Sequence, residues 1–137
     1  MSSTDEKRIM KVFGKTEVPE VSEENLLLYR QYLLAGLDKK TILVGREDFP
    51  WEERYLVGGW SQKEYENLKR TNLSYTDECE LVDILEEEIE DNDLIARVRR
   101  LSDDKHLYVG LSWLTTKNRA GKDYQLLDDF ATWAANW

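Results

Sequence analysis

The sequence predicts an α+β fold, in which a small antiparallel, curled (barrel-like) sheet of about five strands carries three packed helices. Two observations lead to this fold class. Alternating apolar residues over 79–113, interrupted twice by turn residues, predict a meander of antiparallel strands. Apolar residues at helical spacing on both sides of this region predict helices that cover the sheet. For a chain of 137 residues, we expect one globular domain, over 21–137.

The first predicted helix covers residues 22–36. Ser22 is a typical N-cap residue, and Leu26 and Leu33 belong to an apolar stripe at helical spacing. Residues 1–20, in contrast, have mixed charge and no sustained period, and they include a proline. We therefore expect a flexible N-terminal tail that ends shortly before this helix.

Two strands and a second helix are predicted after the first helix. The β-branched run 41–45 and the aromatic-rich run 51–57 are typical of strands, and an acidic loop that contains a proline separates them. Ser61 is followed three residues later by Glu64, which is the pattern of a capping box. The second helix is therefore predicted over 61–70.

The clearest strand pattern lies in residues 79–89, where apolar residues alternate with glutamates. Glutamate and leucine are also good helix formers, so a helix over 81–90 is the main alternative. The pattern that follows favours the strand, because a turn at Asp91–Asn92 leads into two further alternating runs, 94–101 and 107–113. These three strands form the predicted meander.

The third predicted helix follows Gly121. Apolar residues between Leu126 and Trp137 lie on one broad stripe at helical spacing, and Asp123 is a possible N-cap. We expect this stripe to pack against the sheet.

The charge of the chain restricts its partners. The chain has 28 acidic and 19 basic side chains and a formal net charge of −9. Residues 77–93 hold ten of the acids and no base, so the rest of the chain carries a formal charge of +1. A negative surface repels phosphate groups, and we therefore expect no binding to nucleic acid or to anionic membranes. Cations and a basic protein remain as possible partners.

The sequence shows no pattern typical of secretion, of a membrane span or of catalysis. No apolar run reaches the length of a signal-peptide core or a transmembrane helix, so a cytoplasmic location is expected. Cys79 is the only cysteine, which excludes an intrachain disulfide and a zinc site built on paired thiolates. His106 is the only histidine and lies beside a predicted turn, so we do not expect an enzyme.

Carboxylates gather in three places that suggest cation binding. The first is the acidic loop around Phe49–Trp51, with Asp38 at the end of the first helix, the second is the run 77–93, and the third is Asp128–Asp129. Calcium takes about six to eight oxygen ligands, which acidic loops can supply. The alternatives are a solvated turn, an exposed strand face that prevents edge-to-edge association, and an ordinary helix surface. Residues 91–102 lack the glycine of an EF-hand loop, so a calcium site must be assembled across the fold.

Four segments also carry a family resemblance: Gly45–Glu53 (GREDFPWEE), Ser74–Asp77 followed by Glu80-Leu81, Arg97–Asp103 and Tyr124–Phe130. Together they resemble the CcbP-type calcium-binding proteins of cyanobacteria, over residues 22–137. The resemblance implies a small acidic cytosolic protein that binds calcium without EF-hands and has a link to calcium signalling during heterocyst differentiation. It also implies calcium ligands at Asp38, Glu47, Asp48, Glu52, Asp128 and Asp129.

The leading hypothesis is therefore a calcium-binding protein, not an enzyme, that buffers or senses cytosolic calcium through clustered carboxylates. In this hypothesis the run 77–93 concentrates cations and the shorter acidic loops supply the ligands, because same-face neighbours on a strand lie about 6.5 Å apart. The alternative hypothesis is an acidic interaction module that docks on a basic partner without metal.

Overall fold

The computed structural model describes residues 3–90 and 92–137, and the side chains of residues 3 and 87–90 are outside this description. At its centre is a five-stranded antiparallel sheet with the strand order β4-β3-β2-β1-β5. The strands are β1 (Leu43–Gly45), β2 (Cys79–Glu90), β3 (Asp93–Arg100), β4 (His106–Gly110) and β5 (Leu114–Thr116). The helices are α1 (Ser3–Phe13), α2 (Glu23–Gly36), α3 (Glu53–Leu56), α4 (Gln62–Leu68) and α5 (Lys122–Asn136), and a 3-10 turn, η1 (Leu111–Trp113), joins β4 to β5.

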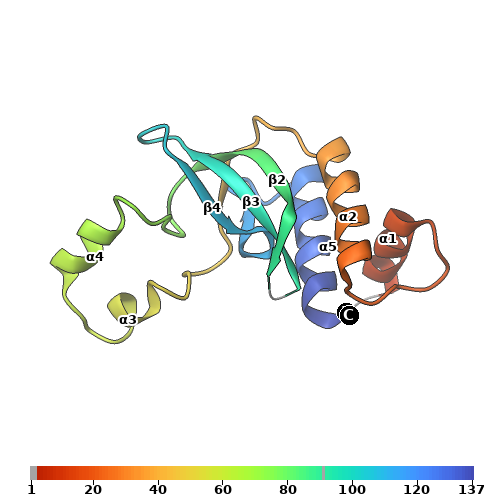
Figure 1. Cartoon of the computed structure of the whole chain (residues 1–137), viewed down its shortest axis with the longest axis horizontal. Coiled ribbons are helices and arrows are strands. Elements are labelled where there is room, and N and C mark those ends of the chain that lie inside the picture. Colours follow the sequence, from red (N-terminus) through yellow and green to blue (C-terminus); the bar gives the residue numbers. More distant parts are fainter. Residues whose placement is uncertain (1–2, 91) are drawn as a thin grey trace.

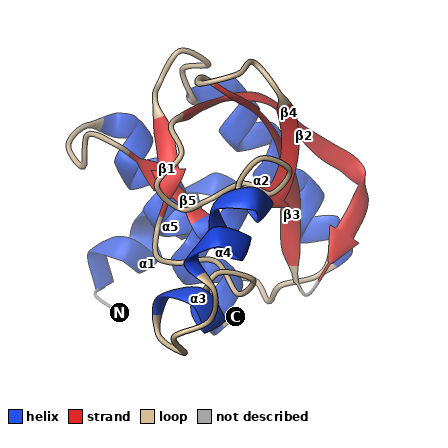
Figure 2. Ribbon diagram, turned by 90° about the vertical axis from the view of Figure 1, so that its left-hand side faces the viewer, coloured by secondary structure: helices blue, strands red, loops and turns tan. Residues whose placement is uncertain are grey.

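The helices lie at two opposite ends of the molecule (Figure 1). At one end α2 and α5 lie beside the sheet, and α1 lies beyond them. At the other end α3 and α4 form a separate arm, which Figure 2 shows in front of the sheet. The long connection between β1 and β2 carries this arm. The sheet is therefore placed between two groups of helices.

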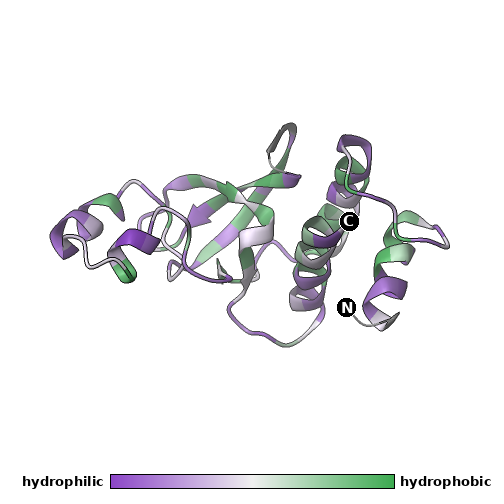
Figure 3. Cartoon of the chain, turned by 90° about the horizontal axis from the view of Figure 1, so that it is seen from below, coloured by the Kyte–Doolittle hydropathy of each residue, from purple (hydrophilic) through white to green (hydrophobic). Residues whose placement is uncertain are grey.

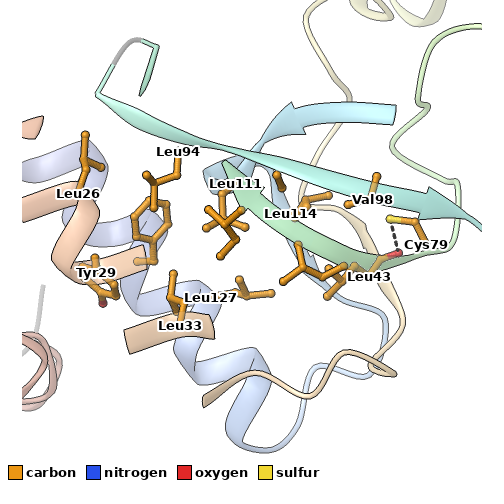
Figure 4. Close-up of a cluster of buried hydrophobic side chains, with 14 of the residues drawn as sticks. Leu26, Tyr29, Leu33, Leu43, Cys79, Leu94, Val98, Leu111, Leu114 and Leu127 are labelled. Carbon is orange, nitrogen blue, oxygen red and sulfur yellow. Dashed lines mark hydrogen bonds between the residues drawn. The ribbon is translucent and has the colours of Figure 1, made fainter. Parts of the chain in front are cut away.

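The main core lies between the sheet and the pair α2–α5. Figure 4 shows Leu33 of α2 and Leu127 of α5 beside each other, with Leu111 and Leu114 of the β4–β5 region close by. All four side chains are buried. Figure 3 shows apolar residues in the strands and along the helices beside them. This is the arrangement that the helical stripes and the alternating strands predict.

The predicted flexible tail is wrong for residues 3–13, because they form α1. Ile9 on this helix is fully buried. The ring of Phe13 lies 5.4 Å from that of Trp133, and the indole N–H of Trp133 donates a hydrogen bond to the carbonyl of Pro19 at 2.8 Å. The N-terminal segment covers apolar surface of α2 and α5 that would otherwise face water.

Three predicted helices are confirmed as α2, α4 and α5. The Ser22 hydroxyl accepts a hydrogen bond from the N–H of Asn25 at 3.2 Å, and the Ser61 hydroxyl accepts one from Glu64 at 3.3 Å. Both serines are therefore N-caps, as their sequence patterns predict. The strand is also confirmed over the helical alternative, because Cys79–Glu90 forms β2.

The predicted strand over 51–57 is wrong, because residues 53–56 form α3. Trp51 lies in the turn before α3 and Tyr55 lies on α3, and their rings are 6.3 Å apart. The fifth strand is instead β5, which pairs with β1 and was not predicted. With α1 and α3, the structure has two helices more than the sequence predicts.

The predicted barrel-like curl is also wrong, because the sheet is open. β1 and β5 have three residues each, and β1 joins β2 through one residue pair, Leu43–Cys79. Strands this short cannot close a sheet on itself, and β4 and β5 remain as separate edges. Of the predicted turn at Asp91–Asn92, Asp91 lies outside the described residues, while Asn92 has a φ of 60°.

Candidate functional site

The six predicted calcium ligands do not come together in one place. Within the described residues, no group of three or more acidic, histidine or cysteine side chains is arranged to hold a metal ion. Glu47 is exposed and Asp48 is half-buried in the loop after β1, and neither forms an ion pair within the described part of the chain. Their loop is therefore not a preformed calcium cage.

Glu52 is a buried anchor of its loop. Its carboxylate is fully buried and accepts four hydrogen bonds. Two come from the hydroxyls of Tyr65 at 2.9 Å and Ser74 at 2.5 Å, and two from the backbone N–H groups of Phe49 at 3.0 Å and Tyr75 at 3.1 Å. Burial and the Glu52 hydrogen bond raise the pKa of Tyr65 to about 12. Because fixed donors occupy both oxygens, this carboxylate holds the protein together and is not open to a cation.

Asp128 and Asp129 are both paired with arginines, on different sides of α5. Asp128 accepts a hydrogen bond from the guanidinium of Arg46 at 3.0 Å. Asp129 is buried and pairs with Arg8 of α1 at 2.8 Å, and it also accepts a hydrogen bond from Gln125 at 3.0 Å. Both carboxylates join elements of the fold, which explains their place beside the apolar stripe.

Basic residues of other segments neutralise the first half of the acidic run. The ion pairs are Asp77–Arg100, Glu78–Lys117, Glu80–Arg99 and Asp83–Arg30. Asp93, at the other end of the run, is buried and accepts a hydrogen bond from the Ser112 hydroxyl at 2.6 Å. The side chains of residues 87–91 lie outside the described residues. In its first half, the run is therefore not an unopposed ladder of negative charge.

The sixth predicted residue, Asp38, lies in a different setting, a hollow of about 320 Å³ between the end of α2 and the start of α5. The hollow is lined by Asp38, Thr41, Thr116, Asn118, Ala120, Lys122 and Asp123. One carboxylate oxygen of Asp38 accepts a hydrogen bond from the N–H of Lys40 at 2.9 Å. The Thr116 hydroxyl donates to the carbonyl of Asn118 at 2.6 Å. Residues with side-chain oxygen atoms from several segments thus line this hollow.

Asp123 is the residue of this hollow that sequence reasoning missed as a candidate ligand. Its Oδ2 accepts hydrogen bonds from the N–H of Asp38 at 3.2 Å and from the Thr41 hydroxyl. Its Oδ1 is buried and has no hydrogen-bond partner within the described residues. The sequence predicts Asp123 only as a helix cap, whereas the structure places Gly121 at the N-cap. Only the fold reveals the contact, because Asp38 and Asp123 are 85 positions apart.

No family model, no curated protein and no solved structure matches this chain. Among the described residues, no helix combines the length and the apolar character that a membrane crossing needs.

Proposed function

We propose that this protein binds calcium in the hollow between α2 and α5, and that it buffers or senses calcium there. The proposal rests on Asp123: it lines this hollow together with Asp38, and its buried Oδ1 has no hydrogen-bond partner within the described residues. A buried carboxylate oxygen without a donor is costly, and a bound cation would remove that cost. The resemblance to CcbP-type proteins supports the same function.

The oxygen atoms around the hollow suit calcium in kind. Calcium prefers hard oxygen ligands from carboxylates, amide carbonyls and hydroxyls, and it tolerates irregular geometry. Asp38 and Asp123 would supply the negative charge, and Asn118 would supply a neutral oxygen. Water would complete a coordination shell of about six to eight oxygens. Soft or nitrogen-seeking metals have no ligand of their preferred kind in this lining.

We expect weak binding. The hollow has two carboxylates, and Lys122 lines it as well, so the net charge that attracts a cation is small. Calcium affinity rises with the number of charged ligands, and weak protein sites have dissociation constants of about 0.1–1 mM. Affinity in this range suits a buffer or sensor of large calcium changes.

Calorimetric titration with calcium in excess magnesium tests the proposal. Asp123→Asn should weaken binding at least about tenfold, because it removes one charge while the asparagine oxygen can still accept from Asp38 and Thr41. Asp38→Asn should have an effect of similar size. Lys122→Gln should strengthen binding, since it removes the cation that competes with calcium in the hollow.

Asp128→Asn serves as the matched control, because Asp128 lies on the same helix but pairs with Arg46. Its calcium affinity should equal that of the natural protein. A flat titration to well above about 1 mM calcium would refute the proposed function. Binding that survives Asp123→Asn and is lost in Asp128→Asn would place the calcium site elsewhere on α5.

A further inference from the structure

A groove of about 430 Å³ runs along β4, on the side of the molecule that carries the α3–α4 arm. All residues of β4, from His106 to Gly110, line it. Successive residues of a strand point to opposite faces, so a groove lined by every residue follows the edge of the strand. Residues 71–73 and 49–51 form the opposite wall. The volume falls in the range of about 300–1,000 Å³ that is typical of ligand pockets.

The edge of β4 that faces this groove is available for pairing. β4 ends the strand order, so within the described residues it pairs with β3 alone. The N–H of Arg100 donates to the carbonyl of Lys105 at 2.8 Å, so these two residues form a hydrogen-bonded pair. Along an antiparallel ladder, hydrogen-bonded pairs alternate with pairs that are not hydrogen-bonded. In the observed register, Leu107 is therefore bonded to β3, whereas Tyr108 directs its N–H and C=O groups outward.

The wall opposite β4 is aromatic and fixed in place. The Trp51 indole donates a hydrogen bond to the carbonyl of Leu73 at 2.9 Å, which ties the two wall segments together. The rings of Phe49 and Trp113 meet edge to face at 6.2 Å. The N–H of Phe49 donates a hydrogen bond to the buried carboxylate of Glu52. Phe49 is buried, so the exposed aromatic surface comes from the half-buried Trp51 and Trp113. Side chains that are already fixed provide binding surface at little cost in conformational entropy.

The charges beside the wall favour a basic occupant. Glu47, Asp48 and Glu53 adjoin segment 49–51 in the sequence, outside the lining of the groove itself, and none of them forms an ion pair within the described residues. The arginines of the same loop are engaged elsewhere, Arg46 with Asp128 and Arg54 over the ring of Trp60. A second copy of this chain, with its own net charge of −9, would be repelled.

We propose that this groove binds an extended, basic segment of a partner protein, which adds to β4 as a sixth strand of the sheet. Main-chain hydrogen bonds to His106 and Tyr108 supply affinity, as in other strand-addition complexes. Apolar side chains of the segment contact the aromatic wall, and its lysine or arginine side chains face Glu47, Asp48 and Glu53. This binding does not depend on the calcium proposal.

Selection from a library of random peptides displayed on phage identifies a probe. We expect enriched peptides that are rich in lysine or arginine and carry apolar residues at alternate positions. The strongest peptide is then synthesised with a fluorescent label, and its affinity is measured by anisotropy. A library that enriches no peptide, or that enriches acidic peptides, would refute the proposal.

Tyr108→Pro tests the main-chain pairing. Proline removes the outward N–H but leaves the bonds between β3 and β4 intact, and edge strands tolerate it at such positions. We expect binding to weaken about fivefold more than in the matched variant Tyr108→Ala, which loses the ring but keeps the N–H. Equal affinities of the two variants would refute strand addition.

Amide hydrogen exchange of the natural protein provides a measurement that needs no variant. The bound peptide should slow exchange at Tyr108, whose N–H faces the groove, and change it little at Leu107, whose N–H already pairs with β3. Protection confined to another surface would refute the groove.

The triple variant Glu47→Gln/Asp48→Asn/Glu53→Gln should weaken peptide binding and reduce its dependence on salt, and unchanged salt dependence would refute the basic occupant.

Discussion

At the scale of single residues, Glu52 shows how this fold holds a buried carboxylate. Its two oxygens accept four hydrogen bonds, from two backbone N–H groups and two hydroxyls. Hydrogen bonds to a charged acceptor are stronger than those between neutral groups, and an unsatisfied buried charge is very costly. The donors therefore replace water around the carboxylate and fix the shape of the loop between β1 and β2.

Glu52→Gln should lower the free energy of unfolding by about 2–4 kcal/mol. The glutamine amide nitrogen would face N–H and hydroxyl donors, so at least one of them would lose its acceptor. Urea unfolding followed by tryptophan fluorescence measures the change. Glu53→Gln is the matched control, because Glu53 is exposed and should change stability by no more than about 0.5 kcal/mol. Equal effects of both variants would contradict the anchor role.

The role of Glu52 illustrates why the site was harder to predict than the fold. An acidic, aromatic loop is typical both of a calcium site and of a hydrogen-bonded anchor. The groups that decide between them, Ser74 and Tyr75, are more than 20 positions away in the sequence. Local patterns carry no information on such pairs. The same holds for Asp129, whose partner Arg8 is 121 positions away.

At the scale of elements, Arg100 fastens the α3–α4 arm to the sheet. Its side chain is 4% exposed and lies at the end of β3. Its guanidinium donates hydrogen bonds to the carbonyls of Lys69, Arg70 and Asn72, just after α4. It also pairs with Asp77 and Asp103, and the Arg100 hydrogen bond lowers the pKa of Asp103 to about 2. One residue therefore links the arm, the sheet and the β3–β4 turn.

Arg100→Lys should loosen the arm without changing the net charge. A lysine has one nitrogen and cannot reproduce the planar set of donors, so two or more carbonyls would lose their partner. Amide hydrogens of residues 62–68 should exchange at least about tenfold faster. Arg99→Lys is the control, because Arg99 makes only more exposed ion pairs. If the amide hydrogens of α4 exchange at the same rate in both variants, Arg100 does not hold the arm.

The elements that sequence reasoning predicted correctly are those set by local chemistry. The serine caps of α2 and α4 and the alternation in β2 each depend on residues a few positions apart. The misassigned segment, 51–57, is rich in aromatic residues that suit either a strand or a short helix. β5 has three residues, and its pairing with β1 requires partners 69 to 73 positions away. Tertiary contacts alone decide such cases.

At the scale of the whole molecule, the charge is organised by ion pairs between distant segments. The sequence places the net charge of −9 in residues 77–93, yet Lys117, Arg30, Arg99 and Arg100 approach the first half of that run. The carboxylates left without ion pairs in the described part include Glu47, Asp48 and Glu53, beside the β4 groove. Folding therefore pairs the carboxylates in the first half of the run with basic residues from other segments.

We expect the N-terminal helix to unfold together with the sheet, because Ile9 belongs to the main core cluster, and one substitution tests this. Ile9 is fully buried against the helices beside the sheet, so Ile9→Ala should lower the free energy of unfolding by about 2–4 kcal/mol. Circular dichroism and tryptophan fluorescence should show the same shifted urea transition, because two-state unfolding has one midpoint for all probes. Lys7→Ala, on the exposed side of α1, should leave the midpoint unchanged. If Ile9→Ala also leaves it unchanged, α1 folds independently of the core and contributes nothing to its stability.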